Sequence, residues 1–86
     1  MIESRTTLRF WKAFSKLPAE IQQNARDSYR VFLDNPSHPG LQFKKLEDQE
    51  VYSIRIGLGY RALGVMKANA IVWFWIGNHN DYDQMI

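Results

Sequence analysis

Apolar residues at helical spacing appear first, near the start of the chain. They are Phe10, Phe14 and Leu17, and steps of three to four residues place them on one side of a helix. Thr6 or Thr7 can cap this helix, because a hydroxyl oxygen there accepts a hydrogen bond from an unpaired backbone N–H. We therefore expect a first helix with a buried apolar side. Residues 2–5 are alternatively a short first strand.

A second apolar stripe predicts a second helix. Its members repeat every three to four residues: Ile21, Ala25, Tyr29 and Phe32. Pro18 suits the first turn, where a missing backbone N–H costs nothing. Asn35-Pro36 ends the helix, because the residue before a proline avoids the α conformation. The two helices are joined almost directly, so we expect an antiparallel hairpin.

Three later segments alternate between apolar and polar residues as strands do: Val51–Ile56, Tyr60–Met66 and Ile71–Ile76. Turns at residues 57–59 and 67–70 join them, and residues 41–46 are a further candidate at the start of the sheet. The segment Ile71–Ile76 is apolar on both faces, so we expect it to lie centrally. Together these elements predict an α+β fold, with the N-terminal helix hairpin packed on one face of a small, mostly antiparallel β-sheet.

Composition narrows the class of protein. At 86 residues, 45% of them hydrophobic, the chain is expected to be a single domain, residues 1–86, with a core of its own. The absence of cysteine excludes disulfides and thiolate chemistry and fits a cytoplasmic location. The first residues lack the apolar stretch of a signal peptide. No apolar run approaches the roughly 20 residues that span a bilayer, so we expect no membrane partner.

The charge of the chain is weakly basic. A net charge of +2 permits nucleic-acid binding without requiring it. Four basic residues recur along the first predicted helix at steps of four, three and four: Arg5, Arg9, Lys12 and Lys16. They form either an ordinary solvated face or a binding surface.

A few polar groups that can support phosphate chemistry lie in the predicted strands and the tail: Arg55, Arg61, His79 and Tyr82. If two strands pair through the turn at residues 57–59, Arg55 and Arg61 lie opposite or diagonal, about 5–8 Å apart at Cβ. Two cations at that distance repel each other unless an anion lies between them, which favours a phosphate site. Alternatively both extend into water, or one of them meets Glu50 or Asp81.

His79 follows the last predicted strand and can accept or donate a proton near neutral pH. The other histidine, His38, is distant in sequence, and the two lack metal-binding spacing, so we expect no metal. No glycine loop opens a helix to hold a phosphate, and we expect no cofactor. Metal-free RNA cleavage fits the remaining set. It uses the 2′-OH of the substrate as nucleophile, together with a base, an acid and cations around the phosphate, and it selects RNA over DNA.

Several short motifs occur in order along the chain: Leu17-Pro18, Asn35-Pro36, Lys44-Lys45-Leu46, Tyr52-Ser-Ile-Arg-Ile56, Gly59-Tyr-Arg61 and Ile76-Gly-Asn-His79, followed by Tyr82. In this order the chain resembles the RelE/ParE toxin superfamily, whose members are the toxins of bacterial type II toxin–antitoxin systems. The resemblance covers nearly the whole chain and implies the α+β fold predicted above. It also implies a partner antitoxin, usually a segment that wraps the toxin and masks its active surface.

The resemblance also assigns roles to individual residues. Arg61 matches the arginine that contacts the scissile phosphate in RNA-cleaving members, and Arg55 matches a basic residue on the preceding strand. His79 matches a position where some members carry a base histidine. Tyr82 lies near a C-terminal tyrosine that other members use.

Other positions extend or weaken this correspondence. Lys44 and Lys45 stand where basic residues of the superfamily contact RNA. Ser53 stands where RelE has a lysine, so one cation of that set is missing. Asp81 and Asp83 add acidic charge near the expected phosphate.

Three hypotheses follow from the resemblance. The leading one is a cytoplasmic toxin that cleaves mRNA on the ribosome. The second is a ParE-like protein that inhibits DNA gyrase by binding alone, which the basic stripe favours. The third is an inactive member of the fold. Trp11 and Phe14 are candidates for aromatic surface that an antitoxin helix covers, although all three tryptophans alternatively fill the core.

Overall fold

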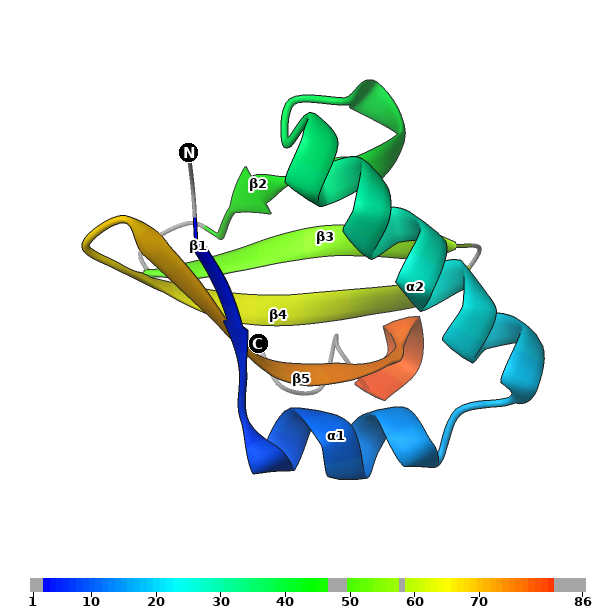
Figure 1. The fold of residues 1–86 in the computed structure, drawn as a ribbon. Helices are drawn as coiled ribbons and strands as arrows, with labels where there is room; N and C mark the ends of the chain where they lie inside the picture. Colours follow the sequence, from blue (N-terminus) through cyan, green and yellow to red (C-terminus); the bar gives the residue numbers. More distant parts are fainter. Residues whose placement is uncertain (1–2, 47–49, 58, 82–86) are drawn as a thin grey trace.

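The computed structural model of the chain describes residues 3–46, 50–57 and 59–81. In these residues one sheet has the strand order β1-β5-β4-β3-β2 (Figure 1). The strands are β1 (Glu3–Thr6), β2 (Lys44–Lys45), β3 (Val51–Gly57), β4 (Tyr60–Lys67) and β5 (Ala70–Asn78). β1 runs parallel to β5, and the other three neighbouring pairs are antiparallel. The predicted small, mostly antiparallel sheet is confirmed.

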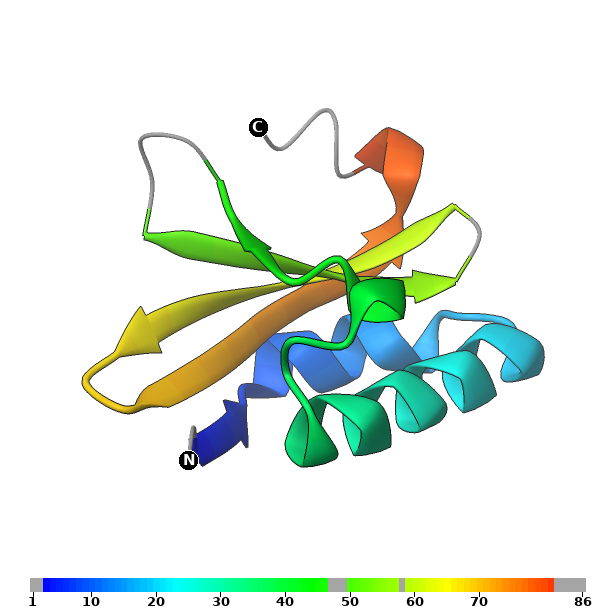
Figure 2. The same cartoon turned by 90° about the horizontal axis from the view of Figure 1, so that it is seen from above.

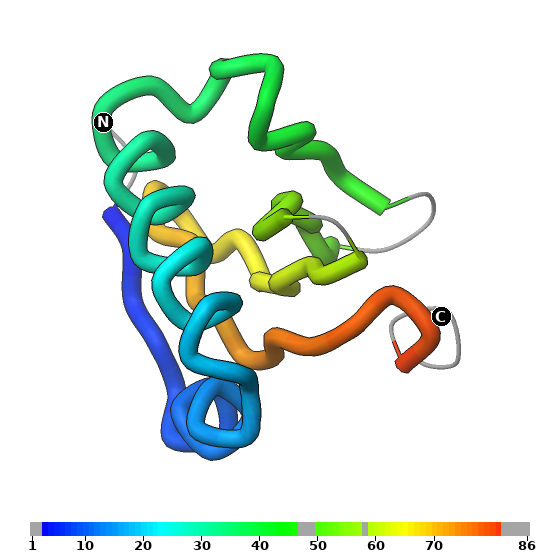
Figure 3. Tube along the Cα trace, turned by 90° about the vertical axis from the view of Figure 1, so that its right-hand side faces the viewer, coloured from blue at the N-terminus to red at the C-terminus, as the bar shows by residue number. Residues whose placement is uncertain are grey.

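Two helices cover one face of this sheet. Helix α1 (Leu8–Ser15) packs against β5, and helix α2 (Ala19–Asp34) packs against β3. Figure 2 shows both helices on the same side of the sheet. Figure 3 shows that β2 and residues 79–81 flank the opposite side, which we call the outer face. The predicted helix hairpin on one face of the sheet is confirmed. No helix in the described residues is long and apolar enough to cross a membrane.

The start of the chain forms both of the elements that the sequence left open, first β1 and then α1. Thr7 is the N-cap of α1, and its hydroxyl oxygen accepts a hydrogen bond of 3.1 Å from the backbone N–H of Phe10. The backbone N–H of Thr7 also donates to the carbonyl oxygen of Trp73 in β5, at 3.1 Å. The cap therefore joins the helix to the sheet.

The expected basic stripe is shorter than the sequence spacing indicated. Arg5 lies in β1 and not on the helix, and its guanidinium lies 3.3 Å from the carboxylate of Glu3. Arg9, Lys12 and Lys16 remain as the exposed basic residues of α1 and its C-cap. The four-residue spacing between Arg5 and Arg9 fitted a helix. Arg5 instead lies in a strand, because β1 pairs with the edge of β5, where Arg5 is the partner of Val72.

Helix α2 begins after Pro18 and ends at Asp34, with Asn35 as its C-cap, as the sequence indicated. Two members of its predicted apolar stripe are buried, Ala25 and Phe32. Tyr29, another member of the stripe, is 39% exposed. It borders the groove that separates the two helices, as described below.

Two expectations about the sheet need correction. The last strand, β5, is interior but not central. It lies between β1 and β4, and β4 is the central strand of the five. Residues 41–46 contribute only the two residues of β2, since a 3₁₀ helix, η1 (Pro39–Leu41), precedes them. β5 is apolar on both faces because a cluster of apolar side chains covers each face.

The larger cluster lies between the helices and the sheet and includes Phe32, Ile54, Ile71 and Trp73, each at most 3% exposed. A smaller cluster lies on the outer face around Leu46 and Leu63, with Val51, Phe74 and Trp75 packed against it. A β-bulge separates the pairs Leu63–Trp75 and Gly64–Trp73, which leaves Phe74 as the additional residue in β5. Both faces of the sheet are therefore closed near its middle.

Candidate functional site

Arg55 and Arg61 are direct cross-strand partners on β3 and β4. The prediction that they lie opposite each other is confirmed, with a register shift between Arg55 and Gly57 beside the pair. Side chains of directly opposed residues lie on one face of a sheet, about 4.5–5.5 Å apart at Cβ. Glu50, which the sequence offered as a partner for an arginine, instead lies 3.5 Å from the Nζ of Lys45. The outer face therefore carries two arginines at opposed positions of neighbouring strands, which suits an anion.

The Arg61 side chain lies along the outer face and does not extend into water, since it is 8% exposed. Its Nε donates to the hydroxyl oxygen of Ser53, which is completely buried. Its two terminal nitrogens donate to the side-chain oxygen and the backbone carbonyl of Gln42, each at 3.4 Å. From the sequence, Ser53 was noted only because RelE has a lysine at that position. Gln42 was not identified there as a partner of Arg61.

His79 lies at the same end of the sheet as the two arginines. The strand register pairs Arg61 with Gly77 and Tyr60 with Asn78. The backbone N–H of His79 then donates to the carbonyl oxygen of Gly59 at 2.6 Å. Its side chain is exposed, at the start of a helical turn over residues 79–81. His79 follows the Arg61–Gly77 pair by two residues along the chain, so it lies close to the arginine pair.

The remaining predicted site residues are divided between locations. Lys44 pairs with Ser53, so it shares the outer face with the arginines. Lys45 pairs with Tyr52, and therefore lies on the opposite face of the sheet. Tyr82 lies outside the described residues, so its role remains a prediction. Lys44 is the better placed of the two lysines for contact with a ligand held by the arginines.

No metal centre is evident in the part of the chain that the structure describes. Within residues 3–46, 50–57 and 59–81, no three His, Cys, Asp or Glu side chains gather where they could hold an ion. Among the residues that the structure describes, Arg55, Arg61 and Lys44 lie on the outer face, and His79 follows the end of β5 near them. Guanidinium groups bind phosphate oxygens in a fork geometry, and an imidazole can transfer a proton beside them.

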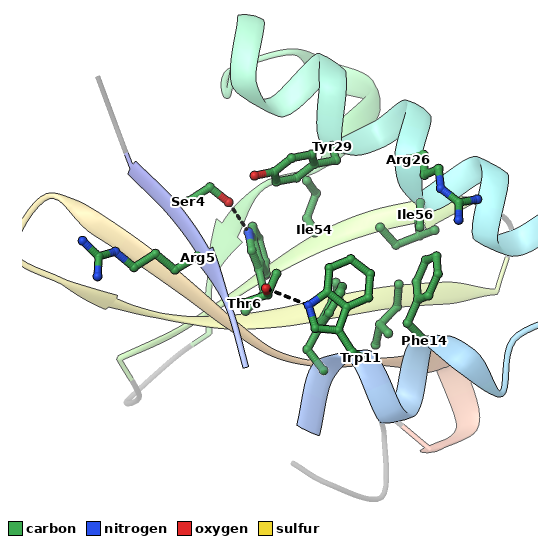
Figure 4. A pocket seen from close by; sticks show the side chains of 14 residues that line it. Ser4, Arg5, Thr6, Trp11, Phe14, Arg26, Tyr29, Ile54 and Ile56 are labelled. Atoms are coloured by element: carbon green, nitrogen blue, oxygen red, sulfur yellow. Dashed lines mark hydrogen bonds between the residues drawn. The ribbon is translucent and has the colours of Figure 1, made fainter. Parts of the chain in front are cut away.

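A second feature, on the other side of the sheet, is an apolar groove of about 220 Å³ between α1, α2 and β1. Figure 4 shows Trp11 and Tyr29 at this groove, with Phe14, Ile54 and Ile56 deeper inside. Trp11 is 49% exposed although its indole N–H already donates to the hydroxyl of Thr6 at 2.9 Å. Of the two aromatic residues expected at the surface, Trp11 is exposed and Phe14 is largely buried, at 9%.

Two cationic side chains border the groove, one of which, Arg5, is paired with Glu3. Arg5 and Arg26 line it, and the guanidinium of Arg26 lies over the ring of Phe14, 5.3 Å from the ring centroid. Among the described residues, no carboxylate lines it. An apolar surface with cationic borders suits a partner segment that carries both apolar and acidic side chains.

Known structures share this fold. A chain of the RelB–RelE antitoxin–toxin complex from Methanococcus jannaschii is 17% identical, with a TM-score of 0.76 over 95% of this chain and 98% of that one. The YoeB/ParE toxin from Agrobacterium tumefaciens is 15% identical, with a TM-score of 0.70 over 91% and 99% of the two chains. The intact RelBE toxin–antitoxin complex from E. coli gives a TM-score of 0.68 at 17% identity, over 91% and 96%.

Sequence comparison identifies the family. No curated protein sequence matches at a significant level. The family model of the ParE-like toxin domain matches residues 19–84, well over half of the chain. The structural neighbours are RelE, YoeB and ParE toxins. The chain therefore belongs to the ParE-like toxin domain family, and it shares its fold with RelE, YoeB and ParE toxins.

Proposed function

We propose that this protein is an mRNA endonuclease that acts on the ribosome and that the outer face of its sheet is the cleavage site. The observation that carries this proposal is the direct pairing of Arg55 with Arg61, with His79 bonded through its backbone to the turn that joins their strands. Two opposed cations are unfavourable by themselves and become favourable around a phosphate. A protein that only presents a binding surface does not require this arrangement.

The proposed chemistry uses the substrate's own 2′-OH. His79 accepts the proton of that hydroxyl, and the resulting oxygen attacks the neighbouring phosphorus. The 5′-oxygen leaves with a proton from an acid, and a 2′,3′-cyclic phosphate remains. Arg61 and Arg55 stabilise the charge that grows on the phosphate oxygens, an effect that typically contributes several kcal/mol in preorganised sites. Tyr82 is the candidate acid, and Lys44 binds the RNA backbone.

Primer extension on cellular mRNA tests this assignment. Wild type, Arg61→Ala, His79→Ala and Arg9→Ala are each induced in a host that lacks an antitoxin. Arg9 is the matched control, because it is an exposed arginine on α1, on the other side of the sheet. We expect cleavage from the wild type and Arg9→Ala and its loss in the other two variants. Equal cleavage by all four proteins would rule out these roles.

Gyrase inhibition without catalysis is the second candidate, and one observation favours it. Arg9, Lys12 and Lys16 are exposed on α1 and its C-cap, where they form a basic surface separate from the arginine pair. The same variants distinguish the two functions. If the protein inhibits gyrase, purified wild type blocks DNA supercoiling at micromolar concentration, Arg61→Ala retains this effect and Arg9→Ala weakens it. A wild type without effect on supercoiling counts against this candidate.

We also propose that an antitoxin occupies the apolar groove between the helices. Two structural neighbours are described as antitoxin–toxin complexes, and the groove here combines an apolar floor with the cations Arg5 and Arg26. The occupant is therefore an amphipathic segment with acidic residues along one side. Burial of the exposed rings of Trp11 and Tyr29 supplies the apolar part of the affinity, at about 25 cal/mol per Å².

The chain offers a closely matched control for this proposal. Trp11 and Leu33 are both 49% exposed, but only Trp11 lines the groove. The tagged protein is co-expressed with the product of the adjacent reading frame, and the pair is recovered on the tag. We expect Trp11→Asp to lose the partner and Leu33→Asp to retain it. Equal recovery with both variants would exclude the groove as the docking site.

A further inference from the structure

The hydrogen bonds around Arg61 indicate how this residue is oriented. A charged side chain that is 8% exposed costs several kcal/mol in desolvation unless hydrogen bonds compensate for the lost water. A guanidinium has five N–H donors, and three of them are directed at Ser53 and Gln42. These bonds restrict both the position and the plane of the group.

Ser53 supplies the fixed end of this arrangement. It pairs with Leu63 on one side and with Lys44 on the other, and it is 0% exposed. Because Arg55 is the direct partner of Arg61, Ser53 is the diagonal neighbour of Arg61. Diagonal neighbours lie about 7–8 Å apart, a distance that an arginine side chain can span. The bond to Nε therefore turns the Arg61 side chain along the outer face. A lysine at position 53 would fill the space that the Arg61 side chain occupies, and its ammonium could not accept the hydrogen bond from Nε.

Gln42 supplies the other end, and its backbone conformation is unusual. It follows η1 with φ 48° and ψ 43°, in the left-handed region that non-glycine residues rarely adopt. In this conformation its carbonyl oxygen and its side-chain oxygen both accept from the same guanidinium, at 3.4 Å each. The preceding turn is held by His38, whose Nδ1 accepts from the backbone N–H of Gly40 at 3.0 Å. Backbone strain of this kind tends to persist where it orients a functional group.

We propose that Ser53 and Gln42 are positioning residues for Arg61, which fix its guanidinium on the outer face before the substrate arrives. The inference rests on the proposed RNA cleavage. It also gives Ser53 a different significance, because this serine replaces a cation of the related nucleases with an acceptor that orients another cation. A preorganised guanidinium stabilises the transition state without a further loss of side-chain freedom, so its loss lowers the cleavage rate more than the affinity for RNA.

The test is single-turnover cleavage of a short mRNA on purified ribosomes, with rate and half-saturation measured separately. Ser53→Ala removes the acceptor for Nε. Gln42→Gly removes the side-chain oxygen but keeps the carbonyl and suits the left-handed conformation. We expect a loss in rate of roughly 10–100-fold for each variant, with half-saturation changed less than about threefold. Ser28→Ala is the matched control, because its hydroxyl donates to the Ile56 carbonyl at 3.5 Å, away from Arg61.

A second arm separates positioning from structural support. Arg61→Lys keeps the charge but cannot form the three-point contact. If Ser53 acts through Arg61, adding Ser53→Ala to Arg61→Lys lowers the rate by less than about twofold, so the two effects are not additive. In NMR spectra we expect the Arg61 Nε–H resonance to be protected from exchange in the wild type and lost in Ser53→Ala.

The outcomes distinguish the inference from the function on which it rests. A wild type that cleaves no mRNA overturns the proposed function, and this inference with it. A wild type that cleaves while Ser53→Ala and Gln42→Gly retain its full rate overturns the inference alone. A loss of rate that merely follows the melting temperature, or that adds fully to the effect of Arg61→Lys, also overturns it.

Discussion

Two buried glycines in neighbouring strands, Gly64 and Gly77, should differ sharply in their tolerance of alanine. A Cβ at Gly64 would lie 2.8 Å from Cγ1 of Ile71 and 2.8 Å from Cε3 of Trp73. A Cβ at Gly77 would come closer still, 2.5 Å from Cζ2 of Trp75. Distance alone therefore predicts that Gly77→Ala is the more damaging substitution. We expect the reverse, because the neighbours differ in their freedom to move.

Gly64 faces side chains that are confined. Ile71 is 0% exposed and Trp73 is 3% exposed, and the indole N–H of Trp73 donates to the hydroxyl of Ser4 at 3.0 Å. Both contacts would fall about 0.7 Å inside the roughly 3.5 Å optimum between carbon atoms. Overpacking in such a core costs about 1–3 kcal/mol. A loss of about 2 kcal/mol lowers Tm by roughly 8–16 °C in a domain of this size.

Gly77 instead faces the far edge of a half-buried indole on the outer face. Trp75 can rotate toward water, so we expect Gly77→Ala to cost less than about 1 kcal/mol and to shift tryptophan emission to longer wavelength. Urea unfolding followed by circular dichroism gives the free energy, and the emission shift should vanish in a Trp75→Phe background. If Gly77→Ala costs more than Gly64→Ala, or if Gly64→Ala costs less than about 0.5 kcal/mol, the reasoning from confinement is refuted.

Three further outcomes follow from individual contacts. Phe32 is 1% exposed, so Phe32→Ala should lower the free energy of unfolding by about 3–5 kcal/mol. Leu33→Ala, at a 49% exposed position, should change it by less than about 0.5 kcal/mol in the same urea titration, and equal losses would contradict the assigned core. Thr7→Ala should cost about 1 kcal/mol through loss of the helix cap, with Thr7→Ser restoring most of it; a cost unchanged by serine would exclude capping as the cause. Arg55→Ala should weaken binding to a single-stranded RNA oligonucleotide and reduce the slope of log affinity against log salt by about 0.7, and a slope that falls equally in Arg9→Ala would contradict a specific phosphate contact.

Much of the architecture follows from local patterns in the sequence. The stripe of Phe10 and Phe14 and the stop at Asn35-Pro36 predicted the two helices, because helix periodicity and proline sterics act within a few residues. The short turn at residues 57–59 predicted that Arg55 and Arg61 would meet, because a tight hairpin leaves few alternative pairings. Their direct opposition also depends on a register shift between Arg55 and Gly57. These inferences needed no contact between distant parts of the chain.

Other features depended on contacts that local patterns do not encode. Arg5 fitted the basic side of a helix, yet it lies in an edge strand that pairs in parallel with β5. Tyr29 fitted an apolar stripe, yet α1 and α2 pack against different strands and leave it at a groove. Lys44 and Lys45 appeared equivalent, yet the alternation of side chains in β2 puts them on opposite faces.

The sequence by itself determined the fold class, the family resemblance and the set of cations that includes Arg55 and Arg61, since periodicity, turn chemistry and short motifs are local properties. Only the tertiary structure decided how Arg61 is held. Gln42 and Ser53 reach it from a loop 19 residues away and a strand eight residues away. Serine and glutamine are among the commonest polar residues at a surface, and neither has a spacing that reveals which donor it will meet. Their role becomes visible only when the chain folds and the buried guanidinium must find its acceptors.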